Sequence, residues 1–365
     1  MSVTIKQVAK EAGVSIATVS RVLNEVGPVS VDARQRVLDA VARLRYVPHG
    51  GARSLITRRT STIGVLLPDI HGEFFSELIR GVDRTARESG YHVLVSGFHS
   101  DRTEIEAVLR ATRGRVDGLI VMTPDVDTRT LRSNLPDGVP SVLLNCRAES
   151  GESDSLDVDN FGGAVAMVRH LASLGHRRIA LVTGPGTNHD ANERRRGYRQ
   201  AMHDLGLPWS EDLEIPGDFT EPGGTRAGLA VLAMRERPTA VFAANDDMAI
   251  GVLAAMREAG VGVPGTLALA GFDDIPAARF VSPALTSVHV DIADLGARAM
   301  QRLLLAIDAK NTHRRRHETL PTTLVVRESC GATCPRQSSS GGPVRPPKPV
   351  TAHLSRGGRD HARKE

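Results

Sequence analysis

The chain has 365 residues, of which 41% are hydrophobic and 24% are charged. This composition is typical of a globular protein with two or three domains. There is no N-terminal signal pattern and no apolar run near the roughly 18 residues of a membrane span, so we expect a cytoplasmic protein without a membrane partner. The three cysteines, Cys146, Cys330 and Cys334, are an odd count and predict free thiols.

Basic residues are distributed unevenly along the chain. Residues 1–59 contain ten Lys or Arg and four Asp or Glu, and residues 335–365 contain seven and two. Because the net charge of the whole chain is only +4, the part between these segments is acidic. A basic head on an acidic body indicates that the head contacts a polyanion.

The head has the pattern of three short helices. Thr4 is a candidate N-cap, Gly13 breaks the first helix, and Ser15 is a candidate N-cap for the second helix. A third helix follows from the cap Ser30, and Val19 is placed to fill the shared core. Two helices that meet at a tight glycine turn predict a helix-turn-helix motif.

The outer face of the second helix predicts contact with duplex DNA. In this motif the N-terminal part of that helix enters the major groove, where Arg21 can bond guanine and Ile16 and Ala17 can touch thymine methyl groups. Hydroxyl, amide and backbone groups nearby can hold phosphates. A helical module that docks on another protein is the alternative. The expected DNA-binding residues of the head are Thr4, Ser15, Ile16, Ala17, Thr18, Ser20, Arg21, Asn24, Val29 and Ser30.

Beyond residue 60 the pattern changes to alternating strands and helices. Short apolar runs such as "STIGVLLP", "DGLIVMTP", "RRIALVTG" and "TAVFAAND" alternate with amphipathic stretches. This alternation predicts doubly wound parallel sheets with helices on both faces. Because about 270 residues are too many for one sheet, we expect two similar lobes.

Polar residues at the ends of these strands are the candidate ligand contacts, because ligands of open α/β sheets bind beyond the carboxyl ends of the strands. The polar residues in these positions are Asp69, Asn245, Asp246 and Asp273. Catalytic and cofactor signatures are missing: "GPG" lacks the third spaced glycine of a dinucleotide site, and "DVDNFG" has Val168 where a calcium loop needs Glu. "HRRRH" at residues 313–317 is interpreted as a solvated connector rather than a metal site. We therefore expect no enzyme activity, no cofactor and no metal.

The segments "TIKQVAKEAGVSIATVSRVLN" and "LRYVPHGGARSL" resemble the head of the lactose-repressor-like (LacI/GalR) family of bacterial transcription factors, and the likeness extends over roughly residues 3–330. The resemblance implies a hinge that folds into a helix on DNA and inserts Leu55 into the minor groove, with Ala52 and Arg53 beside it. Gly50 and Gly51 depart from this pattern, because each glycine costs about 1 kcal/mol inside a helix. A plain linker is the alternative.

The resemblance also implies a fold like that of periplasmic sugar-binding proteins, with an effector held between the lobes. It adds Phe74, Phe219, Arg194 and Asp159 to the candidate contacts, and with less weight Asn188 and Asp190. An arginine that faces several carboxylates beside aromatic rings suits a polyhydroxylated ring, so a sugar is favoured and a purine remains the alternative.

The expected organisation is a headpiece at 1–47, a hinge at 48–60, a two-lobed domain at 61–330 and a disordered tail at 331–365. Lobe 1 would comprise about 61–158 and 291–320, and lobe 2 about 159–290 and 321–330. The resemblance implies a repressor that binds double-stranded operator DNA and is controlled by the effector. We expect a homodimer, because the tail has only Leu354 where some relatives carry a leucine heptad. A binding protein or enzyme with a protein-docking head is the competing hypothesis.

Overall fold

The computed structural model describes residues 3–24, 26–46, 59–98, 102–125, 131, 133–136, 138–146, 153–309 and 312–332. The predicted hinge contacts Ala52, Arg53 and Leu55 lie outside the described residues, as does the tail from residue 333. In the described part of the chain, no helix is long and apolar enough to cross a membrane. Cys146 and Cys330 are buried free thiols, and Cys334 lies outside this part.

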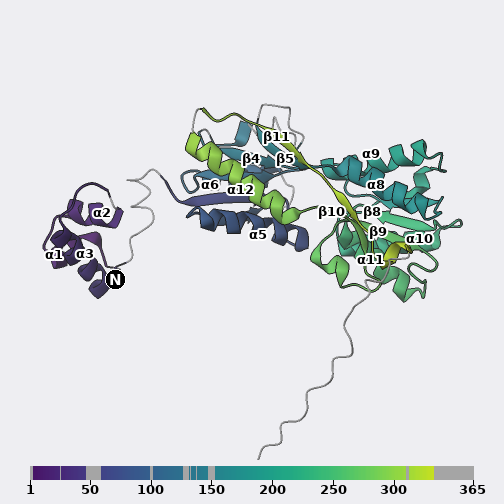
Figure 1. Ribbon diagram of the computed structural model, residues 1–365, viewed down its shortest axis with the longest axis horizontal. Helices are drawn as coiled ribbons and strands as arrows, with labels where there is room; N and C mark the ends of the chain where they lie inside the picture. The colour runs from purple at the N-terminus through teal and green to yellow at the C-terminus, as the bar shows by residue number, and fades with distance from the viewer. Residues whose placement is uncertain are drawn as a thin grey trace, which may run out of the picture. The chain divides into compact units, whose positions relative to one another are not determined.

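The head folds into the three predicted helices, α1 (Ile5–Ala12), α2 (Ile16–Asn24) and α3 (Val31–Leu44) (Figure 1). The Thr4 N–H donates to Gln7 Oε1 at 2.8 Å at the start of α1. Gly13 ends this helix with a φ of 62°, a left-handed conformation that glycine adopts without strain. Ser15 Oγ accepts from the Thr18 N–H at 3.1 Å and caps α2. The side chains of Val8, Ala9, Val19, Val22, Val37 and Ala40 form the core.

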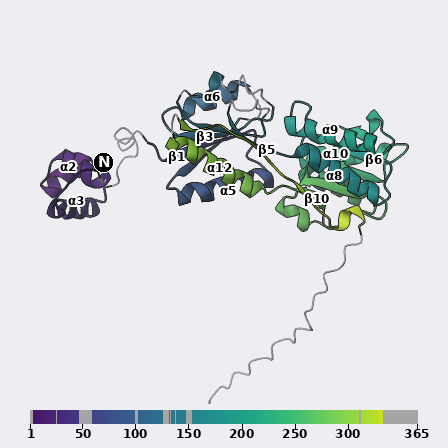
Figure 2. The same cartoon turned by 45° about the horizontal axis from the view of Figure 1, so that its top comes forward.

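The first sheet has the strand order β11-β5-β4-β3-β1-β2, and every pair in it is parallel. Helices α5 and α12 lie together on one face of this sheet, and α6 covers the other face (Figure 2). These elements are called lobe 1 below. Their bounds are β1 (Thr62–Leu67), α5 (Glu73–Glu88), β2 (His92–Gly97), α6 (Arg102–Thr112), β3 (Gly118–Met122), β4 (Ser141–Leu144), β5 (Asp154–Val158), α12 (Ile292–Ala309) and β11 (His317–Leu320).

The second sheet has the order β12-β10-β9-β8-β6-β7, with only β12 antiparallel to its neighbour β10. Helices α8 and α9 pack on one face and α10 and α11 on the other. These elements are called lobe 2. Their bounds are α8 (Asn160–Ser173), β6 (Ile179–Val182), α9 (His189–Asp204), η1 (Glu211–Leu213), β7 (Glu214–Ile215), α10 (Glu221–Ala233), β8 (Ala240–Ala243), α11 (Asp246–Glu258), β9 (Ala268–Asp273), η2 (Pro276–Arg279), β10 (Thr286–His289), β12 (Thr323–Val325) and η4 (Glu328–Cys330).

The chain passes between the lobes at three places. It leaves lobe 1 between β5 and α8, returns between β10 and α12, and leaves again between β11 and β12. The predicted fold class, a helix-turn-helix head followed by a two-lobed α/β body, is therefore confirmed. The interpretation of "HRRRH" as a solvated connector was wrong for His313. Its side chain is only 15% exposed, because its Nε2 lies 2.6 Å from the buried Asp154 carboxylate.

Candidate effector site and DNA-contacting face

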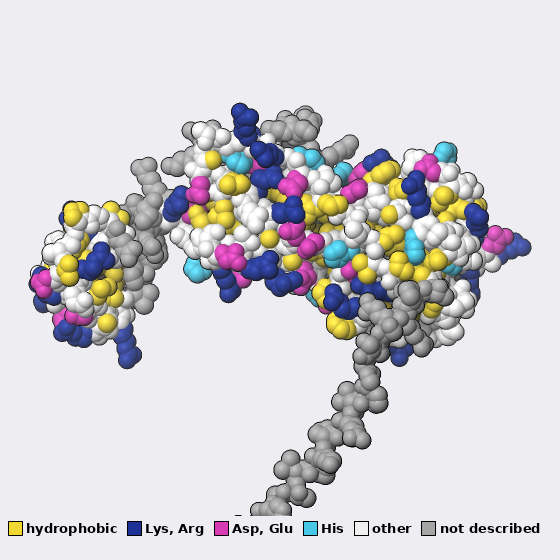
Figure 3. Space-filling view, viewed as in Figure 1, with side chains coloured by type: hydrophobic (Ala, Val, Ile, Leu, Met, Phe, Trp, Pro, Cys, Tyr) yellow, Lys and Arg dark blue, Asp and Glu magenta, His cyan; other side chains and the backbone are white. Residues whose placement is uncertain are grey.

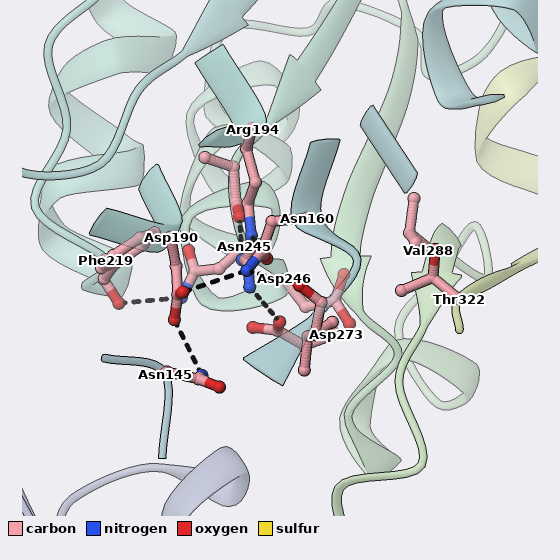
Figure 4. A network of polar contacts seen from close by, with 12 residues as sticks. Asn145, Asn160, Asp190, Arg194, Phe219, Asn245, Asp246, Asp273, Val288 and Thr322 are labelled. Carbon is pink, nitrogen blue, oxygen red and sulfur yellow. Dashed lines mark hydrogen bonds and ion pairs between the residues drawn. The ribbon is translucent and has the colours of Figure 1, made fainter. Parts of the chain in front are cut away.

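Arg194 occupies the centre of a buried polar cluster at the start of α9 (Figure 4). Its Nε donates to Asn160 Oδ1 at 2.7 Å, its Nη1 donates to the Ala244 carbonyl, and its Nη2 lies 3.0 Å from Asp273 Oδ1. The guanidinium also stacks on Phe272, with Cζ 3.8 Å from the ring centroid. Because a buried guanidinium is stable only when it is paired, these contacts hold the side chain in one orientation.

Asp190 lies one helical turn before Arg194 and joins the two lobes. Its Oδ1 accepts from Asn160 Nδ2 at 3.0 Å, and its Oδ2 accepts from Asn145 Nδ2 at 2.8 Å. Asn145 directly follows β4 of lobe 1, and Figure 4 shows it reaching Asp190 from a separate segment. Asn145, Asn160, Asp190, Arg194 and Asp273 are called the Arg194 cluster below.

Two predicted contacts are the N-caps that position these helices. Asn188 Oδ1 accepts from the Ala191 N–H at the start of α9, and Asn245 Oδ1 accepts from the Met248 N–H at the start of α11. The Asn245 Nδ2 also donates to the Phe219 carbonyl at 3.0 Å. The Phe219 ring centroid lies 5.9 Å from the Arg194 guanidinium carbon. Both asparagines therefore fix backbone segments at the edge of the cluster.

The remaining predicted contacts lie outside the cluster. Asp246 is fully buried, and its carboxylate accepts from the Ile275 N–H and the Ser287 hydroxyl, so it stabilises the interior of lobe 2. Asp159 is exposed and caps α8, and Asp69 is exposed and accepts from the backbone of its own turn. Phe74 is half-buried and packs edge-on against Phe75.

Sequence reasoning missed Asn145 and Asn160, which hold Asp190 in place. Asn145 lies at the end of the apolar run "PSVLLNC", in the same strand-end position that selected Asp69 and Asp273, so the signal was present. Asn160 directly follows Asp159 at the start of α8. The short strand that precedes it, "DSLDV", was not predicted, because aspartates interrupt its apolar pattern.

Burial raises the pKa of several aspartates around this site. The pKa of Asp190 rises to about 7, although the nearby Arg194 charge opposes the rise. The pKa of Asp273 rises to about 6 for the same reason and against the same opposing charge. The pKa values of Asp157 and Asp247 also rise to about 6, in both cases chiefly through burial.

These shifts predict that the ligand-free protein becomes less stable as the pH rises. An aspartate in an unfolded chain has a pKa of about 3.9, so between roughly pH 4 and pH 7 the folded protein binds more protons than the unfolded chain. The free energy of unfolding therefore falls across this interval. We expect the melting temperature to decline from pH 5 to pH 8, and the decline to be shallower in Asp190→Asn.

The matched control is Asp204→Asn, which removes a carboxylate at the other end of the same helix. The melting temperature of this variant should decline with pH along the same slope as that of the unmodified protein. If Asp190→Asn followed that slope as well, Asp190 would not titrate in this interval.

Three of the candidates for DNA contact are exposed on α2. Ile16, Ala17 and Arg21 are exposed on α2, whereas Val19 and Val22 of the same helix are buried. Thr18, Ser20 and Asn24 are half-buried along α2, and Asn24 Nδ2 donates to the Ser20 carbonyl. Ser30 caps α3, with Oγ 3.4 Å from the Ala33 nitrogen.

The two lobes carry charges of both signs on the face that Figure 3 shows. On the face visible in Figure 3, dark blue and magenta side chains are interspersed. Many of them form ion pairs, such as Arg80 with Glu77 and Arg298 with Asp294. Within the described ranges, no group of three His, Cys, Asp or Glu side chains could hold a metal ion.

A helical DNA-binding head joined to a two-lobed body with a buried polar site defines the class of ligand-responsive DNA-binding regulators. The model of bacterial regulatory proteins of the lacI family matches residues 4–49, and that of a periplasmic binding protein-like domain matches residues 168–330. The ribose operon repressor of Escherichia coli (strain K12) is 36% identical, over 87% of this chain and 97% of that protein.

Two solved structures are also similar. The lac repressor dimer bound to operator and the anti-inducer ONPF has 29% identity and a TM-score of 0.81, and the match covers 91% of this chain and 100% of that one. The complex of the transcriptional regulator CelR with cellobiose has 31% identity and a TM-score of 0.68, and covers 90% and 99%. The chain belongs to the lacI family of bacterial regulatory proteins, which are DNA-binding transcriptional regulators and not enzymes.

Proposed function

We propose that this protein is a cytoplasmic repressor that binds a pseudo-palindromic operator as a homodimer and is controlled by a sugar or sugar derivative. The DNA-binding part of the proposal rests on the two faces of α2. Val19 and Val22 are buried in the core, and Arg21 is exposed. A homodimer would place two such helices about one helical turn of DNA apart. The operator-bound lac repressor dimer supports this arrangement.

The effector site of this proposal is the Arg194 cluster with the residues that border it. The CelR complex with cellobiose supports a sugar as the effector. The two lobes bond to each other at the cluster, through Asn145 and Asp190. They also bond through the Ala277 N–H, which donates to Glu73 Oε2 at 2.7 Å. A ligand that binds between the lobes and favours one of their relative orientations shifts the population toward it.

A change in the relative orientation of the lobes would be transmitted to DNA through residues 48–60. In this proposal Leu55, with Ala52 and Arg53 beside it, contacts the minor groove between the two headpieces. A wedged apolar side chain kinks the duplex, and the operator would then contain a flexible central step. In the head, the residues proposed to contact DNA are those on the exposed face of α2 and the helix-capping residues that flank it.

The test of the DNA-binding part is Arg21→Ala. Operators are first selected from random duplexes with the full-length protein, and affinity is then titrated at a fixed salt concentration. Loss of a bidentate guanine contact costs about 10-fold to 100-fold in affinity and relaxes selection at one base position in each half-site. The control is Arg43→Ala on α3, whose guanidinium pairs with Glu11 at 3.0 Å.

The selected sequences test the dimer at the same time. An inverted repeat is expected, because operator symmetry follows protein symmetry. Unchanged affinity of Arg21→Ala for every sequence, with no inverted repeat selected, would contradict the proposal and favour a protein-docking head.

A further inference from the structure

The junction between the predicted hinge and lobe 1 is fastened by the carboxylate of Asp117. Its Oδ1 accepts from the Thr60 N–H at 2.7 Å and from the Thr60 hydroxyl at 2.9 Å, and its Oδ2 accepts from the Ser61 N–H at 2.9 Å. Hydrogen bonds to an ionised carboxylate are stronger than those between neutral groups. Both oxygens of Asp117 are therefore engaged by the two residues that directly precede β1.

Ser61 adopts a backbone conformation that serine disfavours. Its φ is 51°, in the left-handed region, where a residue with a Cβ atom is strained. Such a conformation persists only where surrounding bonds impose it. Here the Ser61 N–H donates to Asp117, and the Ser61 carbonyl accepts from the His92 N–H at 2.9 Å. The path of the chain into β1 is thus imposed by residues at the N-terminal ends of both neighbouring strands, β2 and β3.

Asp117 is attached to the interior of lobe 1. It directly precedes β3, which is buried along its whole length and pairs with β1 and β4. Helix α12 packs so closely on Gly118, the first residue of β3, that a Cβ atom there would lie 2.9 Å from a methyl carbon of Leu303. Because packed interiors deform little, Asp117 moves with lobe 1 as a rigid body. The anchored residues 60 and 61 must then follow it.

We propose that Asp117 is a positioning residue that determines which half-site spacing the protein accepts. This inference rests on the proposed function, in which a homodimer places two heads on one operator. Each head is joined to its lobe 1 through residues 48–60, so the distance between the two Thr60 anchors limits the distance between the heads. An anchor fastened by three hydrogen bonds adds no slack to this distance. A released anchor lengthens each tether by residues that can reorient.

Two substitutions release the anchor to different extents. Asp117→Asn has the same size, and its oxygen can still accept from Thr60, but its nitrogen then faces the Ser61 N–H and cannot accept from it. Asp117→Ala removes all three bonds. Asp308→Ala is the matched control, because it also removes one carboxylate at this junction. Asp308 is exposed and pairs with Arg59 at 3.4 Å, and an exposed ion pair restrains a side chain weakly.

The experiment measures the affinity of the full-length protein for the selected operator and for versions with one base pair inserted or removed at its centre. One base pair changes the separation of the half-sites by about 3.4 Å and their relative rotation by about 35°. The unmodified protein should bind the altered operators about 10-fold more weakly, because the DNA must deform to restore the fit.

The variants should change this spacing penalty in a graded way. In Asp117→Ala it should fall to about threefold, because a slack tether reaches either spacing. Affinity for the selected operator should fall about 10-fold, because residues left free in the unbound protein must be ordered on DNA. Asp117→Asn should lie between Asp117→Ala and the unmodified protein, and Asp308→Ala should match the unmodified protein.

A further variant tests the anchor while Asp117 is kept. Ser61→Pro removes the N–H from which Asp117 accepts. It also locks φ near about −65°, far from the observed 51°. The spacing penalty should fall as it does in Asp117→Ala. The double variant should lower the penalty no further, because both changes break the same junction.

The melting temperature of the body is recorded for every variant, which separates loss of the fold from release of the anchor. If Asp117→Ala does not fold, Asp117→Asn and Ser61→Pro decide the outcome. Folded variants that keep the full spacing penalty would overturn the inference. An equal fall of the penalty in Asp308→Ala would also overturn it, because loss of surface charge would then be the cause. If the unmodified protein selects no inverted repeat, the proposed function itself fails, and the selection alone shows this.

Discussion

Replacing Arg194 with methionine is expected to lower the free energy of unfolding by about 3–5 kcal/mol, the cost of breaking a buried ion pair. Arg194 is 4% exposed, and its guanidinium is a cation that faces Asp190 and Asp273. Without it both carboxylates lose their opposing charge, and Asn160 Oδ1 and the Ala244 carbonyl lose a donor. Methionine conserves volume but replaces none of these bonds.

Thermal unfolding measures this effect directly. A domain of this size loses about 2–4 °C per kcal/mol, so the melting temperature should fall by about 10 °C. The fall should be smaller at pH 5 than at pH 8, because protonated Asp190 and Asp273 need no counter-ion. No sugar that stabilises the unmodified protein should stabilise the variant.

The control is Arg196→Met on the same helix, whose exposed guanidinium pairs with Glu193 and stacks on Phe161. Surface substitutions usually change stability by less than about 0.5 kcal/mol. Equal melting temperatures for the Arg194 and Arg196 variants would show that the bonds of the Arg194 guanidinium do not stabilise the fold as expected.

Replacing Val19 with aspartate is expected to abolish operator binding while the two lobes remain folded. Val19 is fully buried between α1, α2 and α3. A core this small supplies only about 3–5 kcal/mol, and an unpaired buried charge costs at least as much. The head therefore unfolds, and the α2 face can no longer be presented to the major groove.

The measurement is operator affinity together with the melting temperature of the body and its response to sugar. Affinity should fall to that of non-specific DNA, and the other two properties should be unchanged. Leu38→Asp provides the matched control, because it adds the same charge at a position of α3 that is 45% exposed. If both variants lost the same affinity, charge repulsion from DNA rather than unfolding of the head would explain the result.

Sequence reasoning was most successful where structure depends on near neighbours. The head could be predicted because Thr4, Gly13, Ser15 and Ser30 act within a few residues of themselves, through caps and a left-handed turn. The parallel sheets could be predicted because strands buried on both faces are continuously apolar, as in β3 and β6. Strands with interrupted patterns, such as β5, were missed.

The composition of the cluster, by contrast, depends on residues that the chain brings together from distant positions. Asn145 and Asp190 are 45 residues apart and meet because strand β4 of lobe 1 ends opposite the start of α9. Similar local positions had dissimilar outcomes: Asp273 faces Arg194, whereas Asp246 bonds Ser287 and Ile275 inside lobe 2. The local sequence does not distinguish the two aspartates, because the partner of each carboxylate lies elsewhere in the chain.

The sequence by itself therefore determined the helix-turn-helix head, the alternating α/β body and the set of polar residues from which a site could be built. Only the tertiary structure decided which of them form the site, which cap helices, as Asp159 does, and which stabilise the interior, as Asp246 does. The physical reason is the separation along the sequence over which each kind of interaction acts. Caps, turns and burial periodicity are satisfied within a few residues, whereas a buried charge is stabilised by whichever partners the packing of two lobes places around it.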